Sequence, residues 1–181
     1  MRIIGGEHGG RRFTPPNNMP YTRPTTDIAK EGLFNVLQHK LDFESLKTLD
    51  LFGVTGSISY ELASRGVPDL TIVEKDNAMF EFIKKTSAAL HLENFKVIKM
   101  DVFKYIQSCT TRFDFIFAGP PYALAAIDDL PKLIFDKHLL NKGGWFILEH
   151  TPRNNYQAFP FFRSERNYGT TVFTTFVEDR E

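Results

Sequence analysis

The sequence contains one cysteine, no long apolar run and no secretory signal, and each of these scarcities excludes a class of protein. A single cysteine, Cys109, excludes a disulfide framework within the chain and fits the reducing cytoplasm, where we expect this protein to reside. No apolar run approaches the roughly 20 residues that a membrane-spanning helix needs. The histidines show no spacing typical of metal ligands, so we expect no metal site.

The sequence also lacks a net charge, because 22 basic residues balance 22 acidic ones. The overall charge therefore gives no indication of a nucleic-acid partner. Residues 1–24 differ, because they carry one acidic residue, Glu7, and four arginines. The arginines are Arg2, Arg11, Arg12 and Arg23. This basic end indicates either an arm that binds a polyanion or a plain solvated segment.

A length of 181 residues suits one domain, and most of the chain alternates between expected strands and expected helices. Expected strands cover about 46–52, 70–73, 95–98, 113–117 and 144–148. Expected helices cover a segment ending near residue 40, then 57–65, 77–90, 102–107 and part of 124–138. Strands and helices that alternate with short links predict an α/β fold, a doubly wound and mostly parallel sheet with helices on both faces.

The two ends of the chain add antiparallel elements to this expected sheet. Residues 1–14 predict a small hairpin, and the proline-rich residues 15–24 predict an extended loop. Two β-rich runs at about 158–167 and 170–178 flank Tyr168-Gly169, which indicates a C-terminal hairpin. We therefore expect seven strands in the main sheet.

Polar and glycine residues follow the ends of several expected strands, where ligands of doubly wound sheets bind. Asp50, Phe52, Gly53, Thr55, Gly56 and Ser57 end the first strand and form the turn after it, Glu74 follows the second, and Asp101 the third. Glu74 stands 18 residues after Gly56, a position from which a carboxylate can bind both ribose hydroxyls. Gly53 and Gly56 lack the third glycine of a dinucleotide fingerprint, so a nucleoside pocket is favoured over an NAD site. Each element alone could be a plain turn or a helix cap.

The fourth expected strand is followed by Gly119, Pro120, Pro121 and Tyr122. Two prolines make a rigid backbone, and the carbonyl before a proline is available to a ligand. An aromatic ring beside them can stack on an extruded base. A proline loop with a core tyrosine is the alternative, and the position after a strand favours the functional interpretation.

Over nearly its whole length the sequence resembles the bacterial 16S ribosomal RNA guanine-N2 methyltransferases of the RsmD type. The matching stretches are MRIIGGEHGGRRF, TRPTTDIAKEGLFNVL, LDLFGVTGSISYELASRG, IVEKD, MDVFKYI, FDFIFAGPPYA and GGWFILEH. The opening stretch, followed by TRPT and LFN, is the distinctive part. The strand-end motifs are shared with many amino-methylating enzymes.

The resemblance implies S-adenosylmethionine as the cofactor and N2-methylguanine in 16S rRNA as the product. It implies that Gly53, Thr55, Gly56 and Ser57 approach the methionine part of the cofactor, that Glu74 holds the ribose, and that Asp101 and Val102 contact the adenine. Asp50 and Phe52 complete this set, and Arg23 and Thr25 would close over the cofactor. Residues 1–24, with Arg2, Arg11 and Arg12, would form an RNA-binding extension of a methyltransferase domain at 25–181. We expect a monomer that acts on an assembling or assembled small ribosomal subunit.

Two positions depart from the family pattern. Gly119 stands where the family has an aspartate that accepts hydrogen bonds from the target amino group, and Val54 stands where a glycine is usual. Asp114 is expected to begin a strand and point elsewhere, and Glu149, at the end of the fifth strand, is a minor candidate for the pocket. A catalytically impaired or non-catalytic RNA-binding relative is therefore the alternative. A small-molecule methyltransferase is disfavoured by the basic arm.

Overall fold

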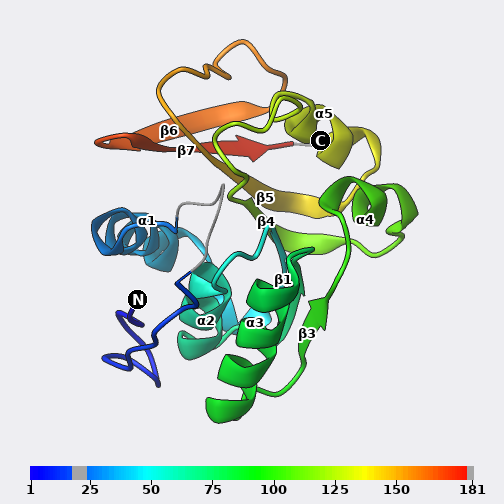
Figure 1. Ribbon diagram of the computed structural model, residues 1–181. Coiled ribbons are helices and arrows are strands. Elements are labelled where there is room, and N and C mark those ends of the chain that lie inside the picture. Colours follow the sequence, from blue (N-terminus) through cyan, green and yellow to red (C-terminus); the bar gives the residue numbers. More distant parts are fainter. Residues whose placement is uncertain (18–23, 179–181) are drawn as a thin grey trace.

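The computed structural model describes residues 1–17 and 24–178, and its centre is a seven-stranded sheet with helices on both faces (Figure 1). The strands are β1 (Lys47–Leu51), β2 (Asp69–Val73), β3 (Phe95–Ile98), β4 (Phe113–Ala118), β5 (Leu140–His150), β6 (Phe162–Tyr168) and β7 (Thr171–Val177). Their order across the sheet is β3-β2-β1-β4-β5-β7-β6. Strands β1 to β5 run parallel and β7 runs antiparallel to both β5 and β6, so the predicted fold is confirmed.

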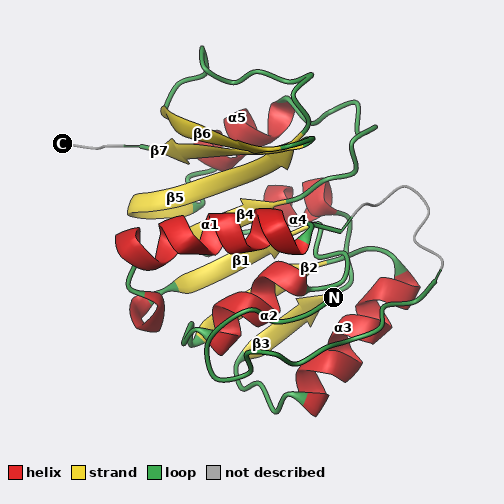
Figure 2. Cartoon of the chain, turned by 90° about the vertical axis from the view of Figure 1, so that its left-hand side faces the viewer, coloured by secondary structure: helices red, strands yellow, loops and turns green. Residues whose placement is uncertain are grey.

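The helices divide between the two faces because neighbouring residues of a strand point to opposite sides. The helices are α1 (Asp27–Lys40), α2 (Ser57–Ser64), α3 (Asn77–Ala89), α4 (Val102–Ser108) and α5 (Asp129–Asp136). Phe115 and Phe117 of β4 pack with α1 and α2, whereas Ile116 between them packs with α4 and α5. Helix α3 joins the first group through Ile83, which packs on Ile72 (Figure 2).

Two predicted boundaries were wrong. Strand β5 extends over Leu140–His150 and not only 144–148, because Gly143 adopts a φ of 74° and the strand continues through it with a register shift opposite β4. Strand β6 begins at Phe162, since residues 151–161 form a loop that buries Tyr156. Helix α5 lies within residues 124–138, which were expected to be partly helical, and it begins at Asp129 because residues 122–128 form turns.

The N-terminal residues fold back on themselves and pack against α2. Ile3 and Arg11 share a backbone hydrogen bond of 2.9 Å, and Phe13 bonds to Met1 at 3.0 Å. The backbone N–H groups of Ile4 and Gly5 donate to the Glu61 carboxylate of α2 at 2.8 and 2.9 Å. This segment therefore rests on the same face of the sheet as α1, α2 and α3.

Candidate functional site

The candidate site lies where the strand order reverses. The chain passes from β1 outward to β2 and β3 and then returns to the other side of β1 with β4, so β1 has β2 and β4 as neighbours. Leu51 at the end of β1 pairs with Val73 on one side and Ala118 on the other. The carboxyl ends of these strands thus meet at a topological switch point, the place where open α/β sheets bind ligands.

The turn after β1 has an unusual backbone. Phe52, Val54 and Gly56 have φ angles of 60°, 53° and 81°, so alternate residues adopt left-handed conformations. Gly56 does this without strain, but a positive φ at a β-branched residue such as Val54 is costly. Gly53 packs so closely on Ile72 that a side chain there would clash. The structure therefore explains both glycines, and it places the strain expected for Val54 at the site.

Glu74 holds this strained turn from the end of β2. One carboxylate oxygen accepts a hydrogen bond from Val54 N at 2.8 Å, and the other accepts one from Asp76 N at 2.8 Å. The side chain is buried, and this burial raises the pKa of Glu74, although the two backbone donors oppose the shift. Each oxygen keeps a further lone pair, so Glu74 can accept hydrogen bonds from a ligand as well.

Asp50 lies beneath the turn and is almost fully buried, with 3% of its surface exposed. Its carboxylate accepts a hydrogen bond from Ser59 Oγ at 2.8 Å. Burial raises the pKa of Asp50 to about 8, and the negative charges of Glu74 and Glu149 add to the shift. Within residues 1–17 and 24–178, neither Asp50 nor Glu74 forms an ion pair.

Asp101 and Val102 lie where β3 leads into α4. Asp101 caps this helix, because its Oδ1 accepts hydrogen bonds from Phe103 N at 3.0 Å and Lys104 N at 3.1 Å. Val102 is buried against the core. Asp101 therefore serves the fold as a helix cap, and its Oδ2 accepts no hydrogen bond from the part of the chain that the structure describes.

Gly119 and Pro120-Pro121-Tyr122 leave the end of β4 directly. Gly119 N donates to Leu51 O at 3.3 Å, which holds this segment beside β1. Pro121 O accepts from Leu124 N at 3.0 Å, whereas Pro120 O accepts no backbone hydrogen bond from a described residue. Pro120 is thus the proline whose carbonyl is available at the strand end. Asp114 lies at the start of the same strand, bonded to Lys47 N at 2.9 Å, and points elsewhere as expected.

Glu149, which was only a minor candidate from the sequence, lies in the same site. It is 4% exposed, and its Oε1 accepts a hydrogen bond from the Thr25 hydroxyl at 2.5 Å. Thr25, Asp50, Gly119 and Glu149 line one small hollow of about 20 Å³, together with residues of the turn after β1. Strands β4 and β5, whose ends pair through Ala118 and Leu148, bring Gly119 and Glu149 side by side.

The expected RNA-binding arginines occupy the N-terminal segment. Arg2 forms an ion pair with Asp27 at 3.1 Å, and the Arg11 guanidinium lies 5.8 Å from the centre of the Phe13 ring. Arg12 is exposed. Arg23, expected to close over the cofactor, lies outside the described residues. Ser57, another expected cofactor residue, lines the hollow and also accepts a hydrogen bond from Lys30 Nζ at 3.0 Å.

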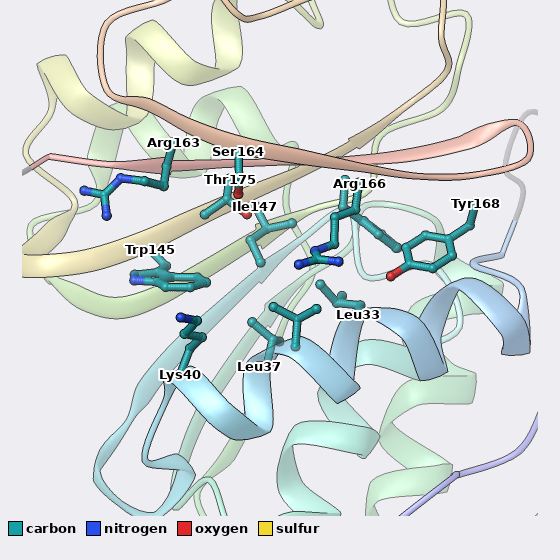
Figure 3. Close-up of a pocket in the computed structure, with 12 residues that line it drawn as sticks. Leu33, Leu37, Lys40, Trp145, Ile147, Arg163, Ser164, Arg166, Tyr168 and Thr175 are labelled. Carbon is teal, nitrogen blue, oxygen red and sulfur yellow. The ribbon is translucent and has the colours of Figure 1, made fainter.

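A second hollow, missed by the sequence, lies along the other side of α1. This α1–β6 groove, of about 330 Å³, runs between α1 and strands β5, β6 and β7. Lys40, Arg166 and Trp145 face it over a floor of Leu33 and Leu37 (Figure 3). Lys40 and Arg166 are exposed and form no ion pair within the described residues. The sequence alone does not bring these residues together, because they come from three elements and only the pairing of the strands shows that they are neighbours.

Membrane spans and metal clusters are absent from the described residues. No helix among them is long and apolar enough to cross a membrane. These residues also contain no group of three or more His, Cys, Asp or Glu side chains placed to hold a metal ion.

Comparison with known proteins identifies the family of this chain. A family model described as conserved hypothetical protein 95 matches residues 1–177. The chain belongs to this family. Its sequence is 28% identical over 160 residues to ribosomal RNA small subunit methyltransferase D of Escherichia coli strain K12, covering 88% of this chain and 79% of the relative. The resemblance to RsmD-type proteins is therefore confirmed.

Another relative agrees with this membership, and two solved structures share the fold. A Bacillus subtilis protein named as a candidate rRNA methyltransferase, YlbH, is 30% identical over 83% of this chain and 82% of its own length. Hypothetical protein TTHA0928 of Thermus thermophilus superposes with a TM-score of 0.86 at 25% identity, covering 98% of this chain and 99% of that one. SMU.776, named as a candidate methyltransferase complexed with SAH, has a TM-score of 0.64 at 19% identity. It shares the fold over 82% of this chain and 49% of its own.

Proposed function

We propose that this chain transfers a methyl group from S-adenosylmethionine to the exocyclic amino group N2 of a guanine in 16S rRNA. One observation carries the proposal: the turn after β1, Glu74, Asp101 and Gly119-Pro120 all lie at the carboxyl ends of adjacent parallel strands around the switch point. The names of the relatives support methyl transfer to rRNA. The structure of SMU.776 with SAH supports the cofactor.

The donor set of the site fits this cofactor. S-adenosylmethionine carries positive charge on its sulfonium and amino groups, and the site buries the carboxylates of Asp50 and Glu74 without a cation among the described residues. Their raised pKa values reflect the cost of charge at these positions, and near neutral pH Asp50, with a pKa of about 8, holds a proton. A cationic ligand would favour the ionised form of both groups. Glu74 would bind the ribose hydroxyls, and Asp101 Oδ2 would accept from the adenine amino group.

The cofactor supplies an electrophilic methyl group, whose carbon bonds to the guanine nitrogen as the carbon–sulfur electron pair returns to sulfur and one N–H proton leaves. A guanine amino group is a poor nucleophile, because its lone pair is delocalised into the ring. Hydrogen-bond acceptors that take its N–H groups localise this lone pair and orient it. The Pro120 carbonyl is one such acceptor, and the half-buried Tyr122 ring would stack on the base.

On this proposal the RNA crosses the face that carries α1. The N-terminal segment with Arg11 and Arg12 flanks one side of this helix, and the α1–β6 groove with Lys40 and Arg166 flanks the other (Figure 2). Exposed cations attract phosphates, and the half-buried Trp145 offers a ring on which a base can stack. A neutral chain would thus bind RNA through local basic surfaces.

The alternative is a non-catalytic RNA-binding relative, and two observations favour it. Gly119 provides no side-chain acceptor at the end of β4, and loss of one preorganised polar group can slow a reaction by about 10²–10³. Val54 occupies a positive-φ position in the turn that would contact the cofactor. Methyl transfer by the wild-type chain decides between the two functions.

The decisive experiment uses labelled S-adenosylmethionine and small ribosomal subunits that lack the modification. The wild-type chain is compared with Gly119→Asp, which requires the Phe117 ring to move by a few tenths of an ångström because a Cβ at position 119 would lie 3.2 Å from it. Transfer by the wild type to a guanine N2, mapped in the product RNA, supports the proposal. Transfer only by Gly119→Asp makes the natural chain a degenerate enzyme, and absence of cofactor binding by both leaves the RNA-binding function.

A further inference from the structure

We propose that Glu149 is a catalytic residue of this chain and accepts a hydrogen bond from the target amino group in the space beside Gly119. This inference rests on the proposed function. The segment after β4, Gly119 to Tyr122, contains no carboxylate that could accept a hydrogen bond from the guanine amino group. The inference concerns which residue provides that carboxylate.

The position of the Glu149 carboxylate is the first argument. Its Oε1 lies 4.0 Å from the point that a Cβ on Gly119 would occupy. Ala118 and Leu148 pair directly, so Gly119 and Glu149 are the next residues along two adjacent strands. A carboxylate from β5 therefore stands within one side-chain length of the strand end that Pro120 and Tyr122 follow.

The second argument is how the carboxylate is held. Only 4% of Glu149 is exposed, and the Thr25 hydroxyl donates to its Oε1 at 2.5 Å. Thr25 and Glu149 are 124 residues apart in sequence and line the same small hollow with Gly119 and Asp50. An acceptor that is already buried and oriented needs little reorganisation when a donor arrives, which is the property that makes polar groups effective in active sites.

The third argument concerns the absence of a side chain at Gly119. Its φ is not among the positive ones, so the backbone conformation does not require glycine. A Cβ there would stand 3.2 Å from the Phe117 ring and 4.0 Å from Glu149 Oε1. Glycine at this position therefore adds no side-chain atoms to the space beside the Glu149 carboxylate.

The chemical role follows from this placement. The carboxylate accepts one N–H of the guanine amino group, the Pro120 carbonyl accepts the other, and the nitrogen lone pair is left directed away from both. The proton that the nitrogen loses passes to the Glu149 carboxylate and from there to solvent. The negative charge of Glu149, which is already among the causes that raise the pKa of Asp50, is neutralised in that step.

The test compares the wild type with Glu149→Gln and with the double variant Gly119→Asp/Glu149→Gln. We expect Glu149→Gln to lose about 10²–10³-fold in the rate of methyl transfer while cofactor affinity changes little. The double variant should recover part of this loss, because Asp at position 119 returns a carboxylate to the same space. Glu81→Gln, the same change at an exposed glutamate on α3, is the matched control and should leave the rate unchanged.

A second readout does not depend on turnover. Guanosine 5′-monophosphate and inosine 5′-monophosphate differ only in the N2 amino group, and their affinities are measured by NMR titration in the presence of S-adenosylhomocysteine. The wild type should prefer the guanosine nucleotide, and Glu149→Gln should lose this preference. If Glu149→Gln unfolds, Glu149→Asp, which withdraws the carboxylate by one methylene, replaces it and should lose the preference in part.

The outcomes separate this inference from the proposed function. Transfer by Glu149→Gln at the wild-type rate overturns the role of Glu149 but leaves the methyltransferase intact. Equal affinity of the wild type for the two nucleotides, or no binding of either, also overturns it. If the wild type transfers no methyl group yet prefers the guanosine nucleotide through Glu149, the proposed reaction fails while the contact stands.

Discussion

Buried carboxylates occur in two regions of this molecule, and the two regions neutralise them differently. Beneath the N-terminal segment, Glu61 is fully buried and lies 3.6 Å from the buried Lys30 ammonium. Glu61 also accepts hydrogen bonds from Ile4 N, Gly5 N and Arg65 Nε. At the strand ends, Asp50 and Glu74 are also buried, but the described residues give them no cation.

The difference shows which region serves the fold and which serves a ligand. A buried charge that is already paired has no need of a charged ligand. Removing either partner of the pair lowers the stability of the fold. A buried charge without a partner costs stability, and such groups with raised pKa values gather at functional sites. The Lys30–Glu61 pair therefore joins α1, α2 and the N-terminal segment, while Asp50 and Glu74 remain available to a positive ligand.

The largest effect is expected from Lys30→Met, which removes the buried ammonium beside Glu61 and leaves Arg65 as the ion-pair partner of that carboxylate. We expect the free energy of unfolding, measured by urea denaturation, to fall by about 2–3 kcal/mol, which is less than the cost of an unpaired buried charge because Arg65 stays bonded to Glu61. Lys132→Met is the matched control, because Lys132 pairs with Asp136 on an exposed surface, and it should not change stability measurably. Adding Glu61→Gln to Lys30→Met should restore part of the loss. Wild-type stability in Lys30→Met would show that Arg65 and the backbone donors satisfy Glu61 without Lys30.

Asp50→Asn should change how stability depends on pH. The pKa of Asp50 is about 8 in the folded protein and 3.8 ordinarily, so between these values the folded state holds a proton that the unfolded state releases. Stability therefore falls as the pH rises through this window, and Asp50→Asn removes that contribution. The Tm of the variant relative to wild type should rise by several degrees from about pH 5 to 8.5, at roughly 2–4 °C per kcal/mol. Parallel Tm curves would contradict a buried, protonated Asp50.

This contrast between regions could be predicted from the sequence only in part. The alternation of strands and helices predicted the sheet, and the residues after β1, β2 and β4 were placed at one edge because parallel strands share a direction. Lys30 was not predicted to be buried, because on α1 alone it lies beside the apolar face, and its burial comes from the N-terminal segment and α2 together. Glu149 was undervalued for the same reason, since its neighbours Thr25 and Gly119 come from distant segments.

The smallest effect concerns the surface. Replacing both Lys40 and Arg166 of the α1–β6 groove by Ala should weaken RNA binding and lower the slope of log affinity against log salt by about one for each phosphate that is no longer bound. Fluorescence anisotropy with a labelled RNA across several salt concentrations measures this slope. Lys85→Ala on α3 is the control, because Lys85 is exposed and lies outside the groove. A slope equal to wild type in the double variant would remove the groove from the RNA-binding surface.

The central claim is that the uncompensated carboxylates at the strand ends hold the cofactor, and calorimetric titration with S-adenosylmethionine tests it most directly. The account predicts that the wild type binds one equivalent of the cofactor. Glu74→Ala, once its Tm shows that it is folded, should bind about 10- to 100-fold more weakly, because two charge-assisted hydrogen bonds to the cofactor are removed. Glu81→Ala, at the exposed glutamate of α3, should bind as the wild type does. A wild-type chain that binds no cofactor, or a Glu74→Ala variant that binds it equally well, would contradict the account.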